Sequence, residues 1–259
     1  MTAKKPTLKI LIDADMIVFR CCAACETPID WDCGITTLHC EHAEAEMLVD
    51  DMVMTIVDKV LNHYKIVGHY EILMCFTDTE NWRKKVMSSY KMNRANKRKP
   101  LGYYKVVEWV KDNFNCYQKD NLEADDCIGI LATLNPKNHI IISGDKDFRS
   151  IPGRFYDFLR DTFYEVSEEE ADYYHLYQTL IGDTADNYKG CPGIGPVAAK
   201  RILDANPTWE AVLEQFVKKN LTEEDALMNA RVARILRKQD YDFKKGQPIL
   251  WQPPRQSSN

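Results

Sequence analysis

Three short apolar segments of this 259-residue chain each run directly into aspartate. They read LKILIDAD at residues 8–15, YEILMCFTD at 70–78 and HIIISGDKD at 139–147. Each has the length of a buried strand, and stretches with helical periodicity, such as residues 45–64, lie between them. Strands that alternate with helices predict an α/β fold with a mostly parallel central sheet flanked by helices. The chain is long enough to give such a fold a substantial core.

The aspartates that follow these strands are predicted to meet at one edge of the sheet. They are Asp13, Asp78, Asp145 and Asp147. Ligands of parallel sheets bind beyond the carboxyl ends of the strands, which is where these side chains would lie. Each acid alone could be a turn residue. Their recurrence at every strand exit instead indicates a shared site.

The segment NLEADDCIGI at residues 121–130 adds three more carboxylates, Glu123, Asp125 and Asp126, at the start of a helix predicted over 122–134. A capped helix explains one or two of them, with Asn121 or Asp120 as the cap. Seven carboxylates at one edge would repel each other unless cations neutralise them. Oxygen-only ligation favours Mg²⁺ or Mn²⁺ over Zn²⁺.

Residues 83–105, RKKVMSSYKMNRANKRKPLGYYK, contain nine basic residues and no acidic one, although the net charge of the whole chain is −5. Such a strip could be a solvated loop or a solubilising face. It could also follow a phosphate backbone toward the acidic edge. Tyr90, Tyr103 and Tyr104 add rings on which bases could stack. No apolar run has the length of a membrane span or a signal segment, so a cytoplasmic location is expected.

The last third of the sequence is predicted to be mostly helical. Ser167 and Glu170 form a capping box, and a helix is expected from Thr222 through ALMNARVARILRK. Between these helices stands GDTADNYKGCPGIGPVAAKRIL, in which Asp183 and Asp186 share a helical face. Its glycines permit a tight turn that could present backbone N–H groups to a phosphate.

Six segments, in order along the chain, together resemble the motifs of the flap endonuclease and 5′–3′ exonuclease family, which includes the 5′-nuclease domain of bacterial DNA polymerase I. They are IDADMIVFR, FTD, WRKKVMSSYKMNR, LEADD, SGDKDF and GDTADNYKGCPGIG. The runs FTDTENWRK and ARIL, and the ending near ILWQP, are similar to the small phage exonucleases. The resemblance implies a PIN-like 5′-nuclease fold with a helical arch and a C-terminal helix–three-turn–helix region. It divides the chain into a nuclease core at 1–166 with a basic arch at about 81–102, a DNA-binding region at 167–251 and a loose tail at 252–259.

The resemblance also implies roles for individual residues. The metal-centre carboxylates would be Asp13, Asp78, Glu123, Asp125, Asp126, Asp145, Asp147, Asp183 and Asp186, holding two Mg²⁺ ions for which Mn²⁺ could substitute. The residues acting on the scissile phosphate would be Arg83, Lys91 and Arg94. The DNA-binding residues would be Tyr90, Asn93, Lys97, Arg98, Lys99, Gly190, Gly193, Gly195 and Lys200.

Two positions depart from the family pattern. Asp15 lies where other members often carry a neutral residue, so we leave it out of the site. Many members carry lysine two residues after GIG, where this chain has Val197. Lys200 and Arg201 could take over that contact with the duplex backbone.

The expected activity is hydrolysis of phosphodiesters near DNA 5′ ends, which leaves 5′-phosphorylated products. The substrate would be duplex DNA with 5′ ends or flaps, and RNA–DNA hybrids if RNA primers are removed during phage DNA replication. The protein is expected to be a monomer. One alternative is a PIN-type ribonuclease, which explains the acids but neither the basic strip nor the GIG turn. A second is a non-catalytic structure-specific DNA-binding protein, which leaves the aligned carboxylates without a purpose.

Five cysteines fall between residues 21 and 40, and Cys22 and Cys25 have C-x-x-C spacing. A structural zinc could combine them with Cys33 and one of Cys40, His39 or His42. The second half of such a pattern is irregular, and residues 21–25 are expected on a helix, where cysteine serves as a small buried apolar residue. We therefore favour buried thiols over zinc.

Overall fold

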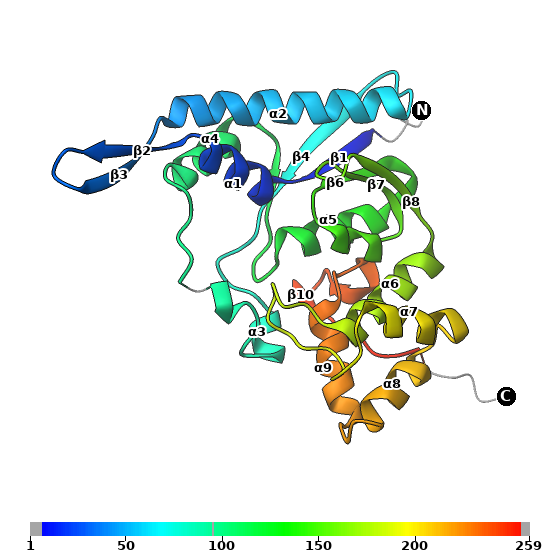
Figure 1. Ribbon diagram of the computed structural model, residues 1–259. Coiled ribbons are helices and arrows are strands. Elements are labelled where there is room, and N and C mark those ends of the chain that lie inside the picture. The colour runs from blue at the N-terminus through cyan, green and yellow to red at the C-terminus, as the bar shows by residue number, and fades with distance from the viewer. Residues whose placement is uncertain (1–6, 95, 255–259) are drawn as a thin grey trace.

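A six-stranded sheet with the order β5-β4-β1-β6-β7-β8 forms the centre of the protein (Figure 1). The computed structural model describes residues 7–94 and 96–254. Every neighbouring pair of strands is parallel except β7 and β8. This confirms the mostly parallel α/β sheet predicted from the sequence. The strands are β1 Leu8–Asp13, β4 Tyr70–Cys75, β5 Cys116–Tyr117, β6 His139–Ser143, β7 Gly153–Asp157 and β8 Thr162–Val166.

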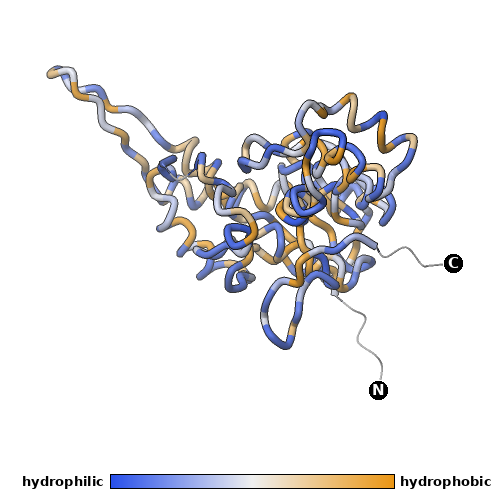
Figure 2. The backbone as a smooth tube through the Cα atoms, turned by 90° about the horizontal axis from the view of Figure 1, so that it is seen from below, coloured by the Kyte–Doolittle hydropathy of each residue, from blue (hydrophilic) through white to orange (hydrophobic). Residues whose placement is uncertain are grey.

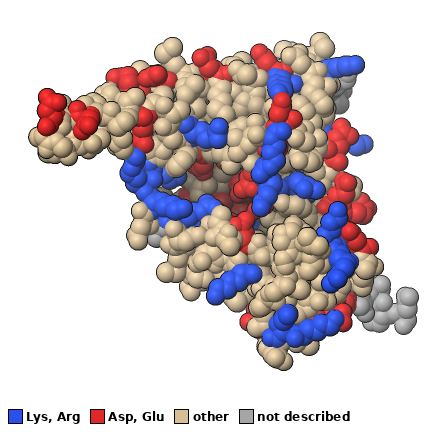
Figure 3. Space-filling view, in the orientation of Figure 1, with Lys and Arg blue, Asp and Glu red and all other residues tan. Residues whose placement is uncertain are grey.

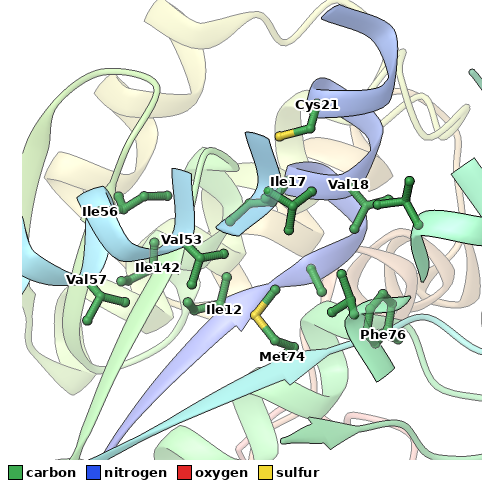
Figure 4. Close-up of a cluster of buried hydrophobic side chains, with 14 of the residues drawn as sticks. Ile12, Ile17, Val18, Cys21, Val53, Ile56, Val57, Met74, Phe76 and Ile142 are labelled. Atoms are coloured by element: carbon green, nitrogen blue, oxygen red, sulfur yellow. The ribbon is translucent and has the colours of Figure 1, made fainter. Parts of the chain in front are cut away.

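Helices cover both faces of the sheet. α1 (Ala14–Ala24), α2 (His42–His63) and α4 (Tyr103–Asn113) lie on one face, and α5 (Ala124–Leu134) lies on the other. Because side chains alternate along a strand, Ile10 and Ile12 of β1 pack toward the first group, whereas Leu11 packs toward α5. Figure 4 shows Ile12 and Met74 of adjacent strands meeting side chains of α1 and α2. The buried strands therefore have apolar residues on both faces, as parallel sheets require.

A second, helical region with its own core follows β8. It contains α6 (Glu168–Ile181), α7 (Pro196–Ala205), α8 (Trp209–Val217) and α9 (Glu223–Ala233). Leu180, Trp209 and Phe216 are buried in its centre. Ser167 caps α6 with the predicted capping box to Glu170. A short hairpin of β9 (Tyr241–Asp242) and β10 (Gln247–Pro248) follows, and Trp251 after it packs against Trp209. Residues 255–259 of the predicted loose tail lie outside the described residues.

Two predicted helix boundaries are wrong. α5 is capped by Glu123, whose side chain accepts from the N–H of Asp126, so the cap is neither Asn121 nor Asp120. α9 ends at Ala233 instead of continuing to Lys238. The chain leaves the helix there because Leu236 donates its N–H to Asp126 at 3.1 Å, a contact that helical geometry would not allow.

The basic strip between β4 and α4 contains only two short helical turns, α3 (Arg83–Val86) and the 3₁₀ turn η1 (Met92–Arg94). The described residues of this strip therefore form no continuous arch helix. Lys91 between the turns has a φ of +55°, which an α-helix cannot contain. The strip nevertheless spans from the helical region back to α4 (Figure 1).

A hairpin of β2 (Glu26–Trp31) and β3 (Ile35–Cys40) was not anticipated. It extends away from the rest of the protein (Figure 2). Its base is fastened to the basic strip, because Arg98 pairs with both carboxylate oxygens of Glu26. Among the described residues, no helix combines the length and the apolar character that a membrane crossing requires.

Candidate metal-dependent nuclease site

A cavity of about 280 Å³ lies beyond the carboxyl ends of β1 and β6, beside the first turn of α5. Figure 3 shows a hollow with acidic side chains in its depth and basic side chains around its edge. Part of the basic strip covers the cavity. The acidic residues that line it are Asp13, Asp15, Glu123, Asp125, Asp145, Asp147 and Asp186.

Asp13 ends β1 and caps α1, so the change from strand to helix fixes its position. One carboxylate oxygen accepts from the N–H of Met16 at 3.3 Å, and the other accepts from the hydroxyl of Ser143 at 2.9 Å. Ser143 ends β6, the neighbouring strand. Burial, and secondly the charge of Asp15, raise the pKa of Asp13 to about 7.

Asp145 and Asp147 follow β6 in the 3₁₀ turn η3 (Lys146–Ser150) and its cap. Asp145 accepts from the N–H of Asp147 at 2.9 Å. Burial, followed by the charge of Asp145, raises the pKa of Asp147 to about 7. Oδ1 of Asp147 is buried and has no hydrogen-bond partner in the described part of the chain. A buried carboxylate oxygen without a hydrogen-bond partner is energetically unfavourable unless another group binds it.

Asp125 on α5 faces the same space. Burial, and then the charges of Asp13 and Asp145, raise the pKa of Asp125 well above its usual range. The donor set and the orphaned oxygen of Asp147 therefore fit a divalent cation. The carboxylates are not yet arranged around a single point, because no three acidic, histidine or cysteine groups in the described chain are placed to hold an ion as they stand. Binding an ion would require side-chain rotation.

Glu123 lies in the same cavity but has cationic neighbours. The ammonium of Lys91 donates a hydrogen bond to Oε1 of Glu123, and Nη1 of Arg83 donates one to Oε2 at 2.8 Å. Burial alone would raise the pKa of Glu123, but Lys91 and Arg83 lower it to about 2. Tyr90 also donates its hydroxyl to Glu123 at 3.0 Å.

Asp186 is the second acid with cationic neighbours. Arg94 Nη2 lies 2.6 Å from its Oδ1, and Lys91 Nζ lies 3.7 Å from its Oδ2. Asp183 accepts from the N–H groups of Ala185 and Asp186 and shapes the loop, but it does not line the cavity.

Besides Asp183, two further predicted ligands, Asp78 and Asp126, do not line the cavity. Both oxygens of Asp126 bind Arg83, and Trp82 and Leu236 donate to it as well, so its acceptor capacity is used inside the core. Asp78, which follows the carboxyl end of β4, accepts from the N–H of Asn121 at 2.8 Å, and this hydrogen bond lowers its pKa. We reassign both as positioning residues.

Arg83, predicted to act on the phosphate, is 2% exposed. It lines the cavity and binds Glu123, and it also donates to the backbone carbonyls of Val232 and Arg234. Arg83 therefore joins α3, α5 and the end of α9 through its hydrogen bonds.

The predicted DNA contacts are divided between exposed and buried positions. Tyr90 is 2% exposed and cannot offer a stacking face, whereas Tyr104 is 70% exposed. Asn93 donates to the carbonyls of Thr184 and Ala185. Lys97, Arg98 and Lys99 of the strip are exposed as well, although Arg98 pairs with Glu26 and Lys99 lies over the ring of Tyr103.

The turn between α6 and α7 contains the predicted glycines. Gly190 and Gly193 have φ values of +63° and +77°. A Cβ on Gly190 would lie 2.3 Å from the nitrogen of Gly182, so only glycine fits. Gly195 is extended and has open space around it. Lys200 is exposed on α7.

Asp15 lines the cavity although we excluded it on the family pattern. It accepts from the N–H of Thr77 and from the hydroxyl of Tyr103, each at 2.8 Å. The signal was present in the sequence, since Asp15 follows Asp13 by two residues at the start of α1. Asp15 thereby ties α1 to β4 and α4.

The cysteines of residues 21–40 are spread over several elements. Cys21 and Cys22 are buried on α1, and Cys25 caps that helix. Cys33 is exposed in the turn of the β2–β3 hairpin. Burial raises the pKa of Cys22 to about 12, which disfavours the thiolate that zinc requires.

Comparison with known proteins places the chain in a family. The family model described as "5′-3′ exonuclease, N-terminal resolvase-like domain" matches residues 9–172. The exodeoxyribonuclease of Enterobacteria phage T3 is 31% identical over 94% of this chain and 92% of its own length. The exonuclease of Escherichia phage T7 is also 31% identical, over 94% of this chain and 93% of its own.

Among solved structures, the bacteriophage T5 flap endonuclease, in a pseudo-enzyme-product complex with DNA and metal ions, has a similar fold. Its TM-score is 0.61 at 16% identity, covering 88% of this chain and 89% of that one. With the family match and the acidic cavity taken together, this chain belongs to the 5′–3′ exonuclease family and is a nuclease of the exonuclease and flap endonuclease type.

Proposed function

We propose that the protein hydrolyses phosphodiesters near the 5′ ends of DNA, with two divalent cations, and leaves 5′-phosphorylated products. The observation that carries the proposal is the convergence of Asp13, Asp125, Asp145 and Asp147 in one cavity under a basic strip. Their raised pKa values indicate that the site is short of positive charge. A phosphodiester is anionic, so a site for it must offer cations.

These four acids would hold one ion. Glu123 and Asp186 would hold the other, and Asp183 could join them if its side chain rotates. Mg²⁺ is the expected ion, and Mn²⁺ could replace it because both prefer oxygen ligands. Two such ions, when bound, would activate the attacking water and stabilise the charge on the leaving 3′ oxygen.

The chain supplies the remaining interactions. Lys91 and Arg94 stand at the mouth of the cavity, where they can contact the scissile phosphate and offset charge that develops on it. Lys97, Arg98 and Lys99 would guide the strand that carries the 5′ end. The α6–α7 turn with Gly190, Gly193, Gly195 and Lys200 would hold the duplex backbone through N–H groups and charge.

The substrates would be duplexes with 5′ ends or flaps, and RNA–DNA hybrids if the protein also removes RNA primers. Because the T3 and T7 relatives are phage exonucleases, the protein would act in phage DNA replication in the host cytoplasm. It would do so as a monomer.

Cleavage of 5′-labelled duplex, flap and single-stranded RNA substrates tests the proposal. Mg²⁺ should support cleavage of the DNA substrates and EDTA should abolish it. Asp147→Asn should remove turnover while DNA affinity stays close to that of the wild type, since cationic groups supply most of that affinity. Full activity without divalent ions, or cleavage of RNA alone, would contradict it.

A further inference from the structure

The acids of the cavity fall into two halves that differ in their partners. We call Asp13, Asp125, Asp145 and Asp147 the open half, because none of them forms an ion pair within the described parts of the chain. One of their oxygens, Oδ1 of Asp147, finds no hydrogen-bond partner among residues 7–94 and 96–254. An ion could enter this half without displacing a cation of the protein.

Glu123 and Asp186 form the paired half. The ammonium of Lys91 binds Glu123 and lies 3.7 Å from Asp186, and Arg94 binds Asp186 at 2.6 Å. The Lys91 ammonium thus stands between two carboxylates, where a bridging divalent ion would stand. Oxygen donors on both sides of a cation are what such an ion requires.

The same residues fasten the basic strip to the loop that carries Asp186. Lys91 donates its N–H to the carbonyl of Asp186 at 2.9 Å. Asn93 and Arg94 donate side-chain N–H groups to the carbonyls of Thr184 and Ala185. Lys91 adopts a left-handed φ of +55°, which is uncommon for a residue with a side chain and marks a locally strained position.

Resting on the proposed function, we propose that Lys91 and Arg94 hold the place of the second divalent cation in the DNA-free protein. The two halves of the cavity then bind divalent cations with unequal affinity. One ion enters the open half readily, whereas a second must displace Lys91 and Arg94 from the paired half. Loading of that second ion releases residues 91–94 from residues 184–186.

The physical reason is repulsion between like charges at short range. A divalent ion bound to Glu123 and Asp186 would lie within a few ångströms of the Lys91 ammonium, in a partly buried cavity where water screens poorly. The ammonium must therefore move away. Once released, Lys91 and Arg94 are free to bind a phosphate, so loading of the second ion and capture of the scissile phosphate become linked steps.

Calorimetric titration of the DNA-free protein with Ca²⁺ measures the loading directly, without any need for cleavage. We expect about one tight site per chain and a second at least tenfold weaker. Lys91→Met should strengthen the second site at least tenfold and leave the first nearly unchanged. Lys84→Met is the matched control, because it removes the same charge from an exposed position of the same strip that forms no ion pair in the described structure.

Amide hydrogen exchange gives a second readout. Saturation with Ca²⁺ should speed exchange at the amide of Lys91, which is bonded to Asp186 in the absence of the ion. Lys91→Arg keeps the charge and should keep the second site weak, which separates a charge effect from a folding defect in Lys91→Met.

Two equal Ca²⁺ sites in the wild type, or a second site that Lys91→Met does not strengthen, would overturn the inference. Increased protection of Lys91 on ion binding would overturn it as well. If DNA cleavage still requires Mg²⁺ in those cases, the proposed function stands. Absence of both Ca²⁺ binding and metal-dependent cleavage would end the inference and the proposed function together.

Discussion

Arg83 and Asp126 form a buried, two-pronged ion pair in which Nη1–Oδ2 and Nη2–Oδ1 are both 2.7 Å apart. Arg83 is 2% exposed and Asp126 is fully buried. The same guanidinium reaches Glu123 in the cavity and the carbonyl of Arg234 beyond α9. A single arginine therefore joins the acidic site, the α/β core and the helical region.

Breaking this pair should destabilise the protein strongly. Asp126→Ala leaves the Arg83 charge buried without its main partner, which should lower the free energy of unfolding by about 3–5 kcal/mol. Urea denaturation measures the change. The exposed pair of Arg98 and Glu26 serves as the control, since Arg98→Met should cost less than about 1 kcal/mol. An equal decrease in the free energy of unfolding in the two variants would show that the buried pair does not stabilise the protein more than the exposed pair.

His175 should make stability depend on pH. Burial, and then the charges of Arg234 and Arg237, lower its pKa well below the usual value of 6.5. Below pH 6.5 the unfolded chain takes up a proton that the folded protein does not, so stability present above pH 6.5 is lost as the pH falls. The loss approaches about 1.4 kcal/mol per pH unit. Urea denaturation at several pH values from 7 to 5 gives the free energy of unfolding as a function of pH. That free energy should fall less steeply with decreasing pH in His175→Gln, whereas His63→Gln, at an exposed position, should keep the wild-type dependence.

Tyr104, and not Tyr90, should be the aromatic residue of the strip that contacts bases. Tyr104→Ala should weaken binding of single-stranded DNA by about 1–3 kcal/mol, the usual range for loss of one stacked base. Tyr90→Phe should leave that affinity unchanged and slow cleavage, because Glu123 and Asp186 lose a hydroxyl donor. Fluorescence anisotropy and single-turnover kinetics separate the two effects. A loss of affinity in Tyr90→Phe alone would reverse the assignment.

Lys97 and Arg98 should differ in their contribution to the salt dependence of binding. Lys97→Ala should reduce the slope of log affinity against log salt for a duplex by about 0.9, the value for one phosphate contact. Arg98→Ala should reduce it by less, since Arg98 must first leave Glu26. Binding isotherms at several salt concentrations give both slopes. A larger change for Arg98 would mean that DNA breaks its pair with Glu26 readily.

Gly190 and Gly195 should have separable roles in the α6–α7 turn. Gly190→Ala should cost more than about 2 kcal/mol of stability, because a methyl group would collide with the backbone of Gly182 at a left-handed φ. Gly195→Ala has open space and an ordinary φ, so the unfolding transition should be unchanged. Duplex affinity should nevertheless fall if a phosphate approaches Gly195 closely. Unchanged duplex affinity in Gly195→Ala would remove this glycine from the interface.

The sequence predicted those features that depend on local pattern. The apolar segments that end at Asp13 and near Asp145 are strands because their side chains are buried on both faces, and parallel pairing brings their ends to one edge. The capping box of α6 could also be predicted from the sequence, because it involves residues only three positions apart. The order of the family motifs identified the type of enzyme from the chain alone.

Only the tertiary structure decided which acids face the cavity and which charges they meet. Asp125 and Asp126 are neighbours in sequence, yet the turn of α5 points Asp125 at the other carboxylates and Asp126 at Arg83. Likewise, Lys91 and Asp186 are 95 positions apart, and their contact exists because the basic strip folds onto the α6–α7 loop. Contacts between distant segments depend on how packed elements meet in space, and no periodicity within one segment records that.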